Sequence, residues 1–271
     1  MYIYLIYRPI YINSTRAFSA PETAGANNYP LRGGKFSNVE GGVRVNSFVT
    51  GGYLPKSQRG TVQEGLIGIE DWYSTFCALA NVNPTDFVAA EAGVPPIDSL
   101  NMWPLLSGAE DKSPRTEVYL SAAAPLPGIS VGMAFPQAII DENGFKLIIG
   151  DSIDSVWTGP FYPNLTSNWN ESTTIFTCTD SPLSGPTPVF DPTTQMYNGA
   201  CLFNVFDDPT EHNNIAADNL DIVKRLSLRL ANLNTTSWNP NRGSQTNLPC
   251  ELSVSAYEGF LGPWLDLMMY D

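Results

Sequence analysis

The segment from Asn28 to Arg44 contains the residues best suited to hold an anion. It places Arg32, Lys35 and Arg44 beside two Gly-Gly pairs and the acid Glu40. A lysine on such a flexible loop can act as a point-charge ligand for an oxyanion. The segment is no Walker loop, because phenylalanine follows the lysine and tyrosine stands where the first glycine is required. A solvated turn in which Arg44 pairs with Glu40 is the alternative interpretation.

Few other residues offer catalytic or binding chemistry. His212 is the single histidine, which excludes sites with several histidine ligands and leaves any Ser-His-Asp triad one candidate base. The four cysteines form no Cys-x-x-Cys pair, so zinc-ribbon and thioredoxin motifs are excluded. With 14 basic against 27 acidic residues and no Lys/Arg run, the chain lacks the basic footprint that nucleic-acid binding requires.

Apolar periodicity indicates the elements that must position the loop. We predict strands over residues 43–50 and 116–120 and a helix over residues 70–81. Asp71 lies in the first turn of this helix, and Cys77 is expected on its apolar face as a free cysteine of the core.

The second half of the chain predicts an antiparallel sheet and a helix. Residues 138–140 and 145–149 form a hairpin whose Asn143-Gly144 turn supplies positive φ angles, and residues 201–206 form a further strand. Leu220 to Leu233 make an amphipathic helix, with Asp218 as its N-cap. Residues 151–200 are rich in Pro, Ser and Thr and are expected to form a surface excursion.

Five segments, in order, resemble the sulfatase family, specifically its arylsulfatase B-like branch. They are PLRGGKFSNVEGGVR at 30–44, LIGIEDWYSTF at 66–76, IDSLNMWPLLSG at 97–108, LFNVFDDPTEH at 202–212 and GPW at 262–264. Five ordered matches are far more specific than any one of them.

The resemblance implies a partial α/β fold. It is the alkaline-phosphatase-like sulfatase fold, followed by a small C-terminal α+β domain with an antiparallel sheet plus a helix. Residues 1–22 are unmatched and look foreign, residues 23–120 would be the C-terminal part of the catalytic domain, and residues 121–271 the C-terminal domain. Without the preceding half, we expect exposed sheet edges and apolar faces.

The resemblance also implies the hydrolysis of sulfate esters. In the family, a formylglycine made within Cys/Ser-x-Pro-x-Arg attacks the sulfate, and Ca²⁺ is held by an Asp-Asp pair, the formylglycine and a later Asp-Asn. No cysteine or serine here supplies that pattern. The Asp207-Asp208 pair lies in the tail motif, where it is structural, and Asp218-Asn219 lies at a helix start. Calcium and formylglycine are therefore expected only in the full-length family, with no metal ligands in this chain.

One catalytic residue carries over by the resemblance. Lys35 aligns with the sulfate-binding lysine and is expected to serve as both the catalytic and the substrate-binding residue, while Arg32, Glu40 and Arg44 support its loop. His212 lies in the tail motif, where we expect a surface or capping role.

Several features favour the secretory pathway, extracellular or lysosome-like, for the full-length protein. Low lysine content accompanies four glycosylation sequons at Asn13, Asn164, Asn170 and Asn234. The first twelve residues lack a basic region and a small-residue cleavage site, so we expect no signal peptide in this chain. No segment has the roughly 20 apolar residues that span a membrane.

We predict a disulfide between Cys178 and Cys201, because they flank a Pro- and Gly-rich loop that ends on a strand in a chain of secretory character. In the sulfatase branch the segment around Cys250 is tied to the N-terminal half. The resemblance therefore leaves Cys250 unpaired here.

Two main hypotheses follow for function. The first is a sulfuric ester hydrolase of arylsulfatase type, represented by its C-terminal part and acting on a sulfated small molecule or sulfated glycan. The second is a catalytically inactive, secreted sulfatase-like glycoprotein. A related phosphohydrolase is the less favoured third. A truncated gene model or a short paralogue explains the missing motifs, and the oligomeric state is left open.

Overall fold

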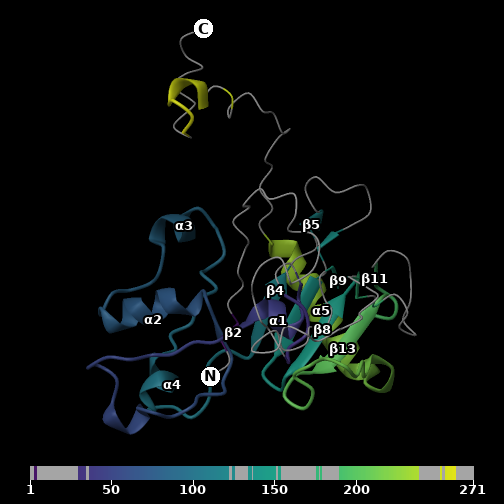
Figure 1. Ribbon diagram of the computed structural model, residues 1–271, viewed down its shortest axis with the longest axis horizontal. Coiled ribbons are helices and arrows are strands. Elements are labelled where there is room, and N and C mark those ends of the chain that lie inside the picture. The colour runs from purple at the N-terminus through teal and green to yellow at the C-terminus, as the bar shows by residue number, and fades with distance from the viewer. Residues whose placement is uncertain are drawn as a thin grey trace, which may run out of the picture. The chain divides into compact units, whose positions relative to one another are not determined.

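The computed structural model describes residues 3–4, 30–34, 37–121, 124–125, 134–135, 137–150, 152–153, 175–176, 178, 189–237, 251 and 254–260 (Figure 1). The chain divides into two compact units, Met1–Thr236 and Ser237–Asp271. In the second unit residues 254–256 are helical. The elements that bear on function belong to the first unit.

A four-stranded antiparallel sheet forms the larger core of the first unit. Its strands are β4 (Glu117–Ser121), β7 (Gln137–Asp141), β8 (Phe145–Ile149) and β13 (Ala200–Asn204). Their spatial order is β13-β8-β7-β4, so the predicted hairpin β7–β8 lies at the centre. The predicted domain boundary after residue 120 falls within β4, which pairs with β7 and so belongs to this sheet.

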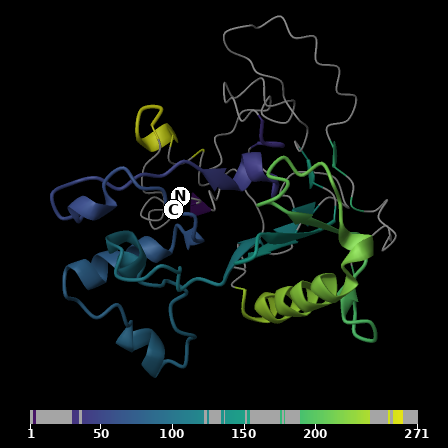
Figure 2. The ribbon, with the colours of Figure 1, turned by 90° about the horizontal axis from the view of Figure 1, so that it is seen from below.

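Helix α5 (Leu220–Thr236) covers one face of the sheet, as Figure 2 shows. Its Val223, Leu226 and Leu230 recur on one side of the helix and pack against Ile139 and Leu147. This sheet and helix confirm the predicted C-terminal α+β arrangement.

The other face of the sheet is buried as well. Ile140 and Ile148 pack there with Val39 and Val43, which flank and end the short helix α1 (Glu40–Val43). Because both faces are covered, β7 and β8 are apolar on both sides, and any charged side chain within them must find its partners inside the protein.

The first part of the unit is a smaller α/β region. A three-stranded sheet has the order β2-β1-β3, with β1 (Ile3–Tyr4) antiparallel to β2 (Arg44–Val45) and parallel to β3 (Ile67–Gly68). The helical elements are η2 (Lys56–Gln58), α2 (Asp71–Leu79), α3 (Phe87–Glu91) and α4 (Trp103–Ser107). The predicted strand over 43–50 was too long, because helix α1 takes Val43 and only Arg44–Val45 pairs.

Three further strand pairs are short. They are β5 (Ala124–Pro125) with β6 (Ala134–Phe135), β9 (Ser152–Ile153) with β10 (Ile175–Phe176), and β11 (Phe190–Asp191) with β12 (Met196–Tyr197).

Helix α2 (Asp71–Leu79) lies within the predicted range of 70–81, but its polar side, and not its apolar side, faces the interior. Its buried residues are Asp71, Ser74 and Thr75, whereas Tyr73 and Phe76 are 54% and 59% exposed. The inner side chains hold the backbone of residues 98–102: Ser74 Oγ donates to the Ser99 carbonyl at 3.0 Å, and Thr75 Oγ1 accepts from the Met102 amide at 2.9 Å.

Cys77 is correspondingly not a core residue. It is a free cysteine and only half-buried, because the apolar side of α2 faces outward.

Two local predictions also need correction. Asp218 ends a 3₁₀ turn, η3 (Ala216–Asp218). The amides of Ile222 and Val223 in the first turn of α5 donate to the carbonyl of Asn219, so the predicted N-cap was wrong by one residue. In the β7–β8 turn only Gly144 has a positive φ, of 80°, and Asn143 does not. The Asp141 carboxylate instead fixes this turn by accepting from the amides of Asn143 and Phe145.

Candidate functional site

The anion-loop segment, residues 30–44, is closed by backbone hydrogen bonds. The Gly41 amide donates to the Arg32 carbonyl at 2.7 Å, and the Ser37 amide donates to the Gly34 carbonyl at 3.1 Å. Glycine is required at residue 41, because a Cβ there would lie 2.3 Å from the Gly33 carbonyl oxygen. Lys35 lies outside the described residues, but its neighbours Gly34 and Ser37 are described.

Three charged side chains meet beneath this segment, and we call them the buried triad: Glu40, Lys146 and Glu211. Each is 0% exposed. Lys146 Nζ lies 2.6 Å from Glu40 Oε1 and 2.9 Å from Glu211 Oε1, and it donates to the Asn38 carbonyl at 3.2 Å. Glu211 Oε2 accepts from the Glu40 amide at 2.6 Å. The triad thus ties the anion-loop segment to strand β8 and to the tail motif.

The charges of the triad do not balance, which shifts its protonation. Burial alone would lower the pKa of Lys146, but the carboxylates of Glu211 and Glu40 outweigh it and hold that pKa above its ordinary value. Burial raises the pKa of Glu211 to about 7, opposed by the Lys146 ammonium and reinforced by the Glu40 carboxylate. Near neutral pH the triad therefore exchanges one proton at Glu211.

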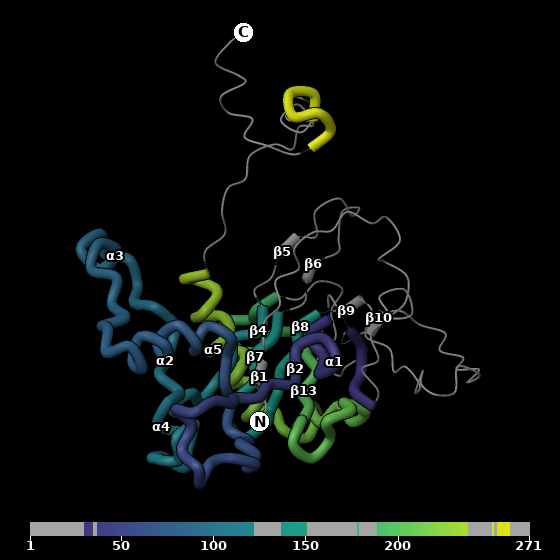
Figure 3. Tube along the Cα trace, turned by 60° about the vertical axis from the view of Figure 1, so that its left-hand side comes forward, coloured from purple at the N-terminus to yellow at the C-terminus, as the bar shows by residue number. Residues whose placement is uncertain are grey.

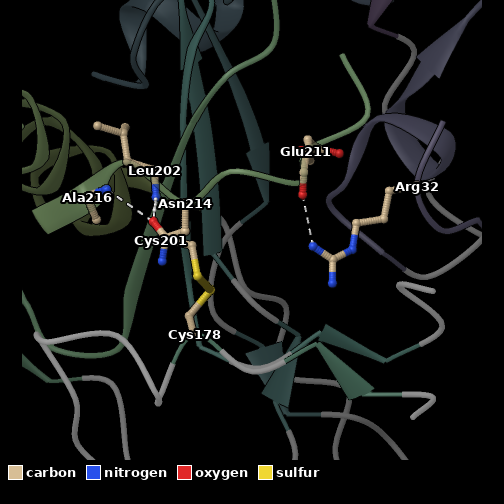
Figure 4. Close-up of a disulfide and its surroundings, with 7 residues drawn as sticks. All are labelled: Arg32, Cys178, Cys201, Leu202, Glu211, Asn214 and Ala216. Carbon is tan, nitrogen blue, oxygen red and sulfur yellow. Dashed lines mark hydrogen bonds between the residues drawn. A yellow bond between two sulfur atoms is a disulfide. The ribbon is translucent and has the colours of Figure 1, made fainter. Parts of the chain in front are cut away.

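Two arginines complete the anchoring of the segment. Arg32 Nη1 donates to the Glu211 carbonyl at 3.1 Å, as Figure 4 shows, and Arg44 Nη1 lies 3.7 Å from Glu40 Oε2. Arg44 therefore pairs with Glu40, as the solvated-turn interpretation required. The turn is not solvated, however, because Glu40 is fully buried.

Sequence reasoning missed Lys146, and it named Glu211 only as part of a motif. The signal for Lys146 was its place within Phe145–Ile149, a continuous apolar strand apart from this lysine. A strand that is apolar on both sides is buried on both faces, so a lysine in it needs buried acids.

A second charged cluster, which also escaped sequence reasoning, holds α2 in place. Arg115 makes a two-nitrogen contact with the buried carboxylate of Asp71 and donates to the Asp98 carbonyl at 2.7 Å. Asp71 in turn accepts from the amides of Gly68 and Leu100 at 2.7 and 2.8 Å. Asp71 is therefore structural, and it joins β3, α2 and residues 98–100.

The predicted disulfide between Cys178 and Cys201 is present, with Cα atoms 5.3 Å apart (Figure 4). Near the disulfide, Asn214 Oδ1 accepts from the amide of Leu202, which lies on β13, at 3.0 Å and from the amide of Ala216 at 3.1 Å. Cys250 lies outside the described residues.

Of the four sequons, Asn13, Asn164 and Asn170 lie outside the described residues. The amide nitrogen of Asn234 donates to Gln137 Oε1 and to the Tyr197 hydroxyl, and its Oδ1 accepts from the Tyr119 hydroxyl at 2.6 Å. A glycan on that nitrogen would displace at least one of these bonds, so the geometry disfavours glycosylation of Asn234 in the folded chain.

The tail-motif acids and histidine have local roles. Asp208 Oδ2 accepts from the Asn213 amide at 2.8 Å and Asp208 Oδ1 from Thr210 Oγ1 at 3.0 Å, while exposed His212 contacts Thr210 Oγ1 at 2.9 Å.

Within the described part of the chain, no group of three or more His, Cys, Asp or Glu side chains could hold a metal ion. These residues do not fit a calcium site, and we derive no step through calcium. No helix among the same residues is both long and apolar enough to cross a membrane.

Comparison with known proteins points to the sulfatases. The chain is 29% identical to Arylsulfatase J of Mus musculus over 227 residues. The aligned region covers 79% of this chain and 33% of that relative. This similarity supports a sulfatase relationship for the chain, which spans about a third of the length of this curated relative.

Two other comparisons add no support for the family. No family model matches the chain. A solved Bacteroides thetaiotaomicron chain labelled 6S-sulf, described with the metabolism of multiple glycosaminoglycans, matches with a TM-score of 0.42 at 19% identity, covering 76% of this chain and 32% of that one.

Proposed function

We propose that this sulfatase homologue supplies the sulfate-binding loop of a sulfuric ester hydrolase of arylsulfatase type. The observation that carries the proposal is the buried triad. It anchors the segment containing Lys35 through Glu40 and Asn38, at a site where Lys146 and Glu211 are fully buried. A loop that must hold a charge in register with a substrate needs such rigid support.

In this role Lys35 binds a sulfate oxygen with its ammonium group and stabilises the negative charge that develops as the ester bond breaks. A single positioned charge contact of this kind is worth about 10²-fold or more in turnover. We propose that the nucleophile and any metal ligands of such a hydrolase lie outside the part of the fold that this chain spans.

The proposed substrates are sulfate esters of a small molecule or glycan, and the proposed location is the secretory pathway. The Cys178–Cys201 disulfide supports an oxidising compartment, since such bonds persist mainly in secreted proteins. Glycans at Asn13, Asn164 and Asn170 are proposed on the same basis.

A fusion tests the function. The part of mouse Arylsulfatase J outside the matched region is joined to this full chain, and release of nitrophenol from its sulfate ester is measured. Lys35→Met should lower turnover about 10²-fold or more. Lys56→Met, at an exposed lysine of η2, is the matched control and should stay within two-fold. An active fusion that tolerates Lys35→Met would refute the role of Lys35.

A fusion that folds but hydrolyses nothing would instead favour the inactive, secreted glycoprotein. The full chain by itself should hydrolyse no aryl sulfate above background and should bind no calcium below roughly 10 µM. Its sequence has no Cys/Ser-x-Pro-x-Arg motif for the nucleophile, and its described residues contain no set of acidic side chains that could hold a metal. Calorimetry and the same ester assay check both statements.

A further inference from the structure

The region between Phe48 and Leu100 exposes far more apolar surface than the rest of the described chain. Twelve of the nineteen exposed large hydrophobic residues among the described ones lie there. Phe48 is 85% exposed, Tyr53 74%, Phe87 62% and Val88 80%. Among the described residues, the neighbouring core cluster consists of four buried side chains and four partly buried ones: Ile67, Met102, Leu105 and Leu106, with Val45, Val49, Trp72 and Trp103 packed against them.

This surface contains a preformed cleft between residues 49–54, α2 and α4, helices that lie side by side in Figure 3. The cleft has a volume of about 290 Å³. Aromatic rings dominate its walls: Tyr53 and Trp103 lie 5.3 Å apart, and Trp72 and Phe76 stack at 5.6 Å. We call this cleft, with the exposed rings of Phe48, Tyr53, Tyr73 and Phe76 around it, the aromatic face.

The lining offers no cation to a sulfate group. Its ten residues include no charged side chain, and the hydroxyl of Thr75 is already used by the Asp71 carbonyl and the Met102 amide. A polar ligand needs convergent hydrogen-bonding groups to orient it, and a sulfate would lose its hydration without a compensating cation. Apolar side chains of a polypeptide need neither.

The amount of exposed surface also suits a polypeptide. A fully buried aromatic side chain covers about 150–250 Å², so covering the five exposed rings of Phe48, Tyr53, Tyr73, Phe76 and Phe87 would bury on the order of 500–850 Å². A standard protein interface buries about 800 Å² on each partner. Large exposed patches of this kind mark interaction sites.

We propose that the aromatic face docks the polypeptide of the sulfatase fold that this chain does not contain. The chain spans a third of the length of its relative, so about two thirds of the relative's polypeptide has no counterpart in this chain and could supply the cover. The inference rests on homology and packing and is independent of hydrolase activity.

The test uses the full 271-residue chain. It is co-expressed with the part of mouse Arylsulfatase J outside the matched region, and complex formation is followed by affinity capture and light scattering. We expect a 1:1 complex and a change in tryptophan fluorescence, since Trp72 and Trp103 line the cleft. Phe76→Asp should weaken association at least ten-fold, because the complex would bury an unpaired carboxylate.

Leu228→Asp is the matched control, at a residue 38% exposed on α5, and should leave association unchanged. Tyr73→Asp serves as a second test variant, and circular dichroism checks that each variant folds. A complex without hydrolysis leaves the docking proposal standing and rejects only the proposed function. Absence of a complex, a complex indifferent to Phe76→Asp and Tyr73→Asp, or a homodimer that Phe76→Asp dissociates would each overturn it.

Discussion

Replacing Lys146 with methionine keeps an unbranched side chain of similar length but removes the shared cation of the buried triad. The carboxylates of Glu40 and Glu211 then face each other, with Arg44 at 3.7 Å from Glu40 as a weak, partly exposed partner. Breaking one buried ion pair costs about 3–5 kcal/mol. Since one lysine serves both acids, at 2.6 and 2.9 Å, we expect the upper half of that range, about 4–5 kcal/mol, at pH 7.5.

The cost should shrink in acid. The pKa of Glu211 is about 7 with Lys146 in place, and removing the Lys146 ammonium raises it further, so the folded variant takes up this proton at a higher pH than the unmutated chain does. Because the unmutated chain takes up most of the same proton between pH 7.5 and 5, we expect the loss of unfolding free energy to shrink by about 1 kcal/mol or less at pH 5. The sign follows from linkage, because the folded variant gains stability from a proton that the unfolded chain holds less tightly.

Urea unfolding of the full chain, followed by tryptophan fluorescence at pH 5 and 7.5, measures both values. Arg229→Met is the control: it removes an ion pair with Glu117 of 2.6 Å, but Arg229 is 48% exposed, so the loss should be at most about 1 kcal/mol at either pH. A loss below 1 kcal/mol for Lys146→Met at pH 7.5, or a larger loss at pH 5 than at pH 7.5, would refute the reasoning.

Three further predictions concern the same sheet and its surroundings. The pKa of Glu211 rises from 4.5 to about 7 on folding, so unfolding free energy should fall as pH rises through that window; Glu211→Gln should flatten the profile in urea titrations, and an unchanged slope would contradict it. Cys201→Ser should cost about 3 kcal/mol, since the disulfide closes a separation of 23 residues, and equal stability of oxidised and reduced chain would count against this. Thr236→Ala removes the sequon of Asn234 but leaves its bonds to Gln137 and Tyr197; intact mass spectrometry of chain from a secretory host should show no lost glycan.

The second half of the fold could be predicted from the sequence, because its signals are local. The apolar runs of β7 and β8 and the Leu spacing of α5 each specify one element and one buried side. Two details at their ends differ: Asn219 and not Asp218 accepts the first hydrogen bonds of α5, and of the predicted Asn143-Gly144 turn only Gly144 takes a positive φ.

The orientation of α2 could not be predicted, because periodicity shows which side is apolar and not which side faces the core. Asp71, Ser74 and Thr75 turn inward because Arg115 and the backbone of residues 98–102 supply their partners. The buried triad could not be predicted either, because it also depends on contacts between distant segments. Its members are far apart in sequence, so no local spacing indicates that they meet.

The triad has a consequence for the order of folding. The contact between Glu40 and Glu211 joins residues separated by 171 positions. At about 5–20 residues per second, the ribosome needs on the order of 10–30 s to deliver Glu211 after Glu40. Until then the segment around Lys35 lacks its second acid anchor, and contacts of such long range form slowly. The anion-loop segment should therefore be among the last parts of the nascent chain to become ordered.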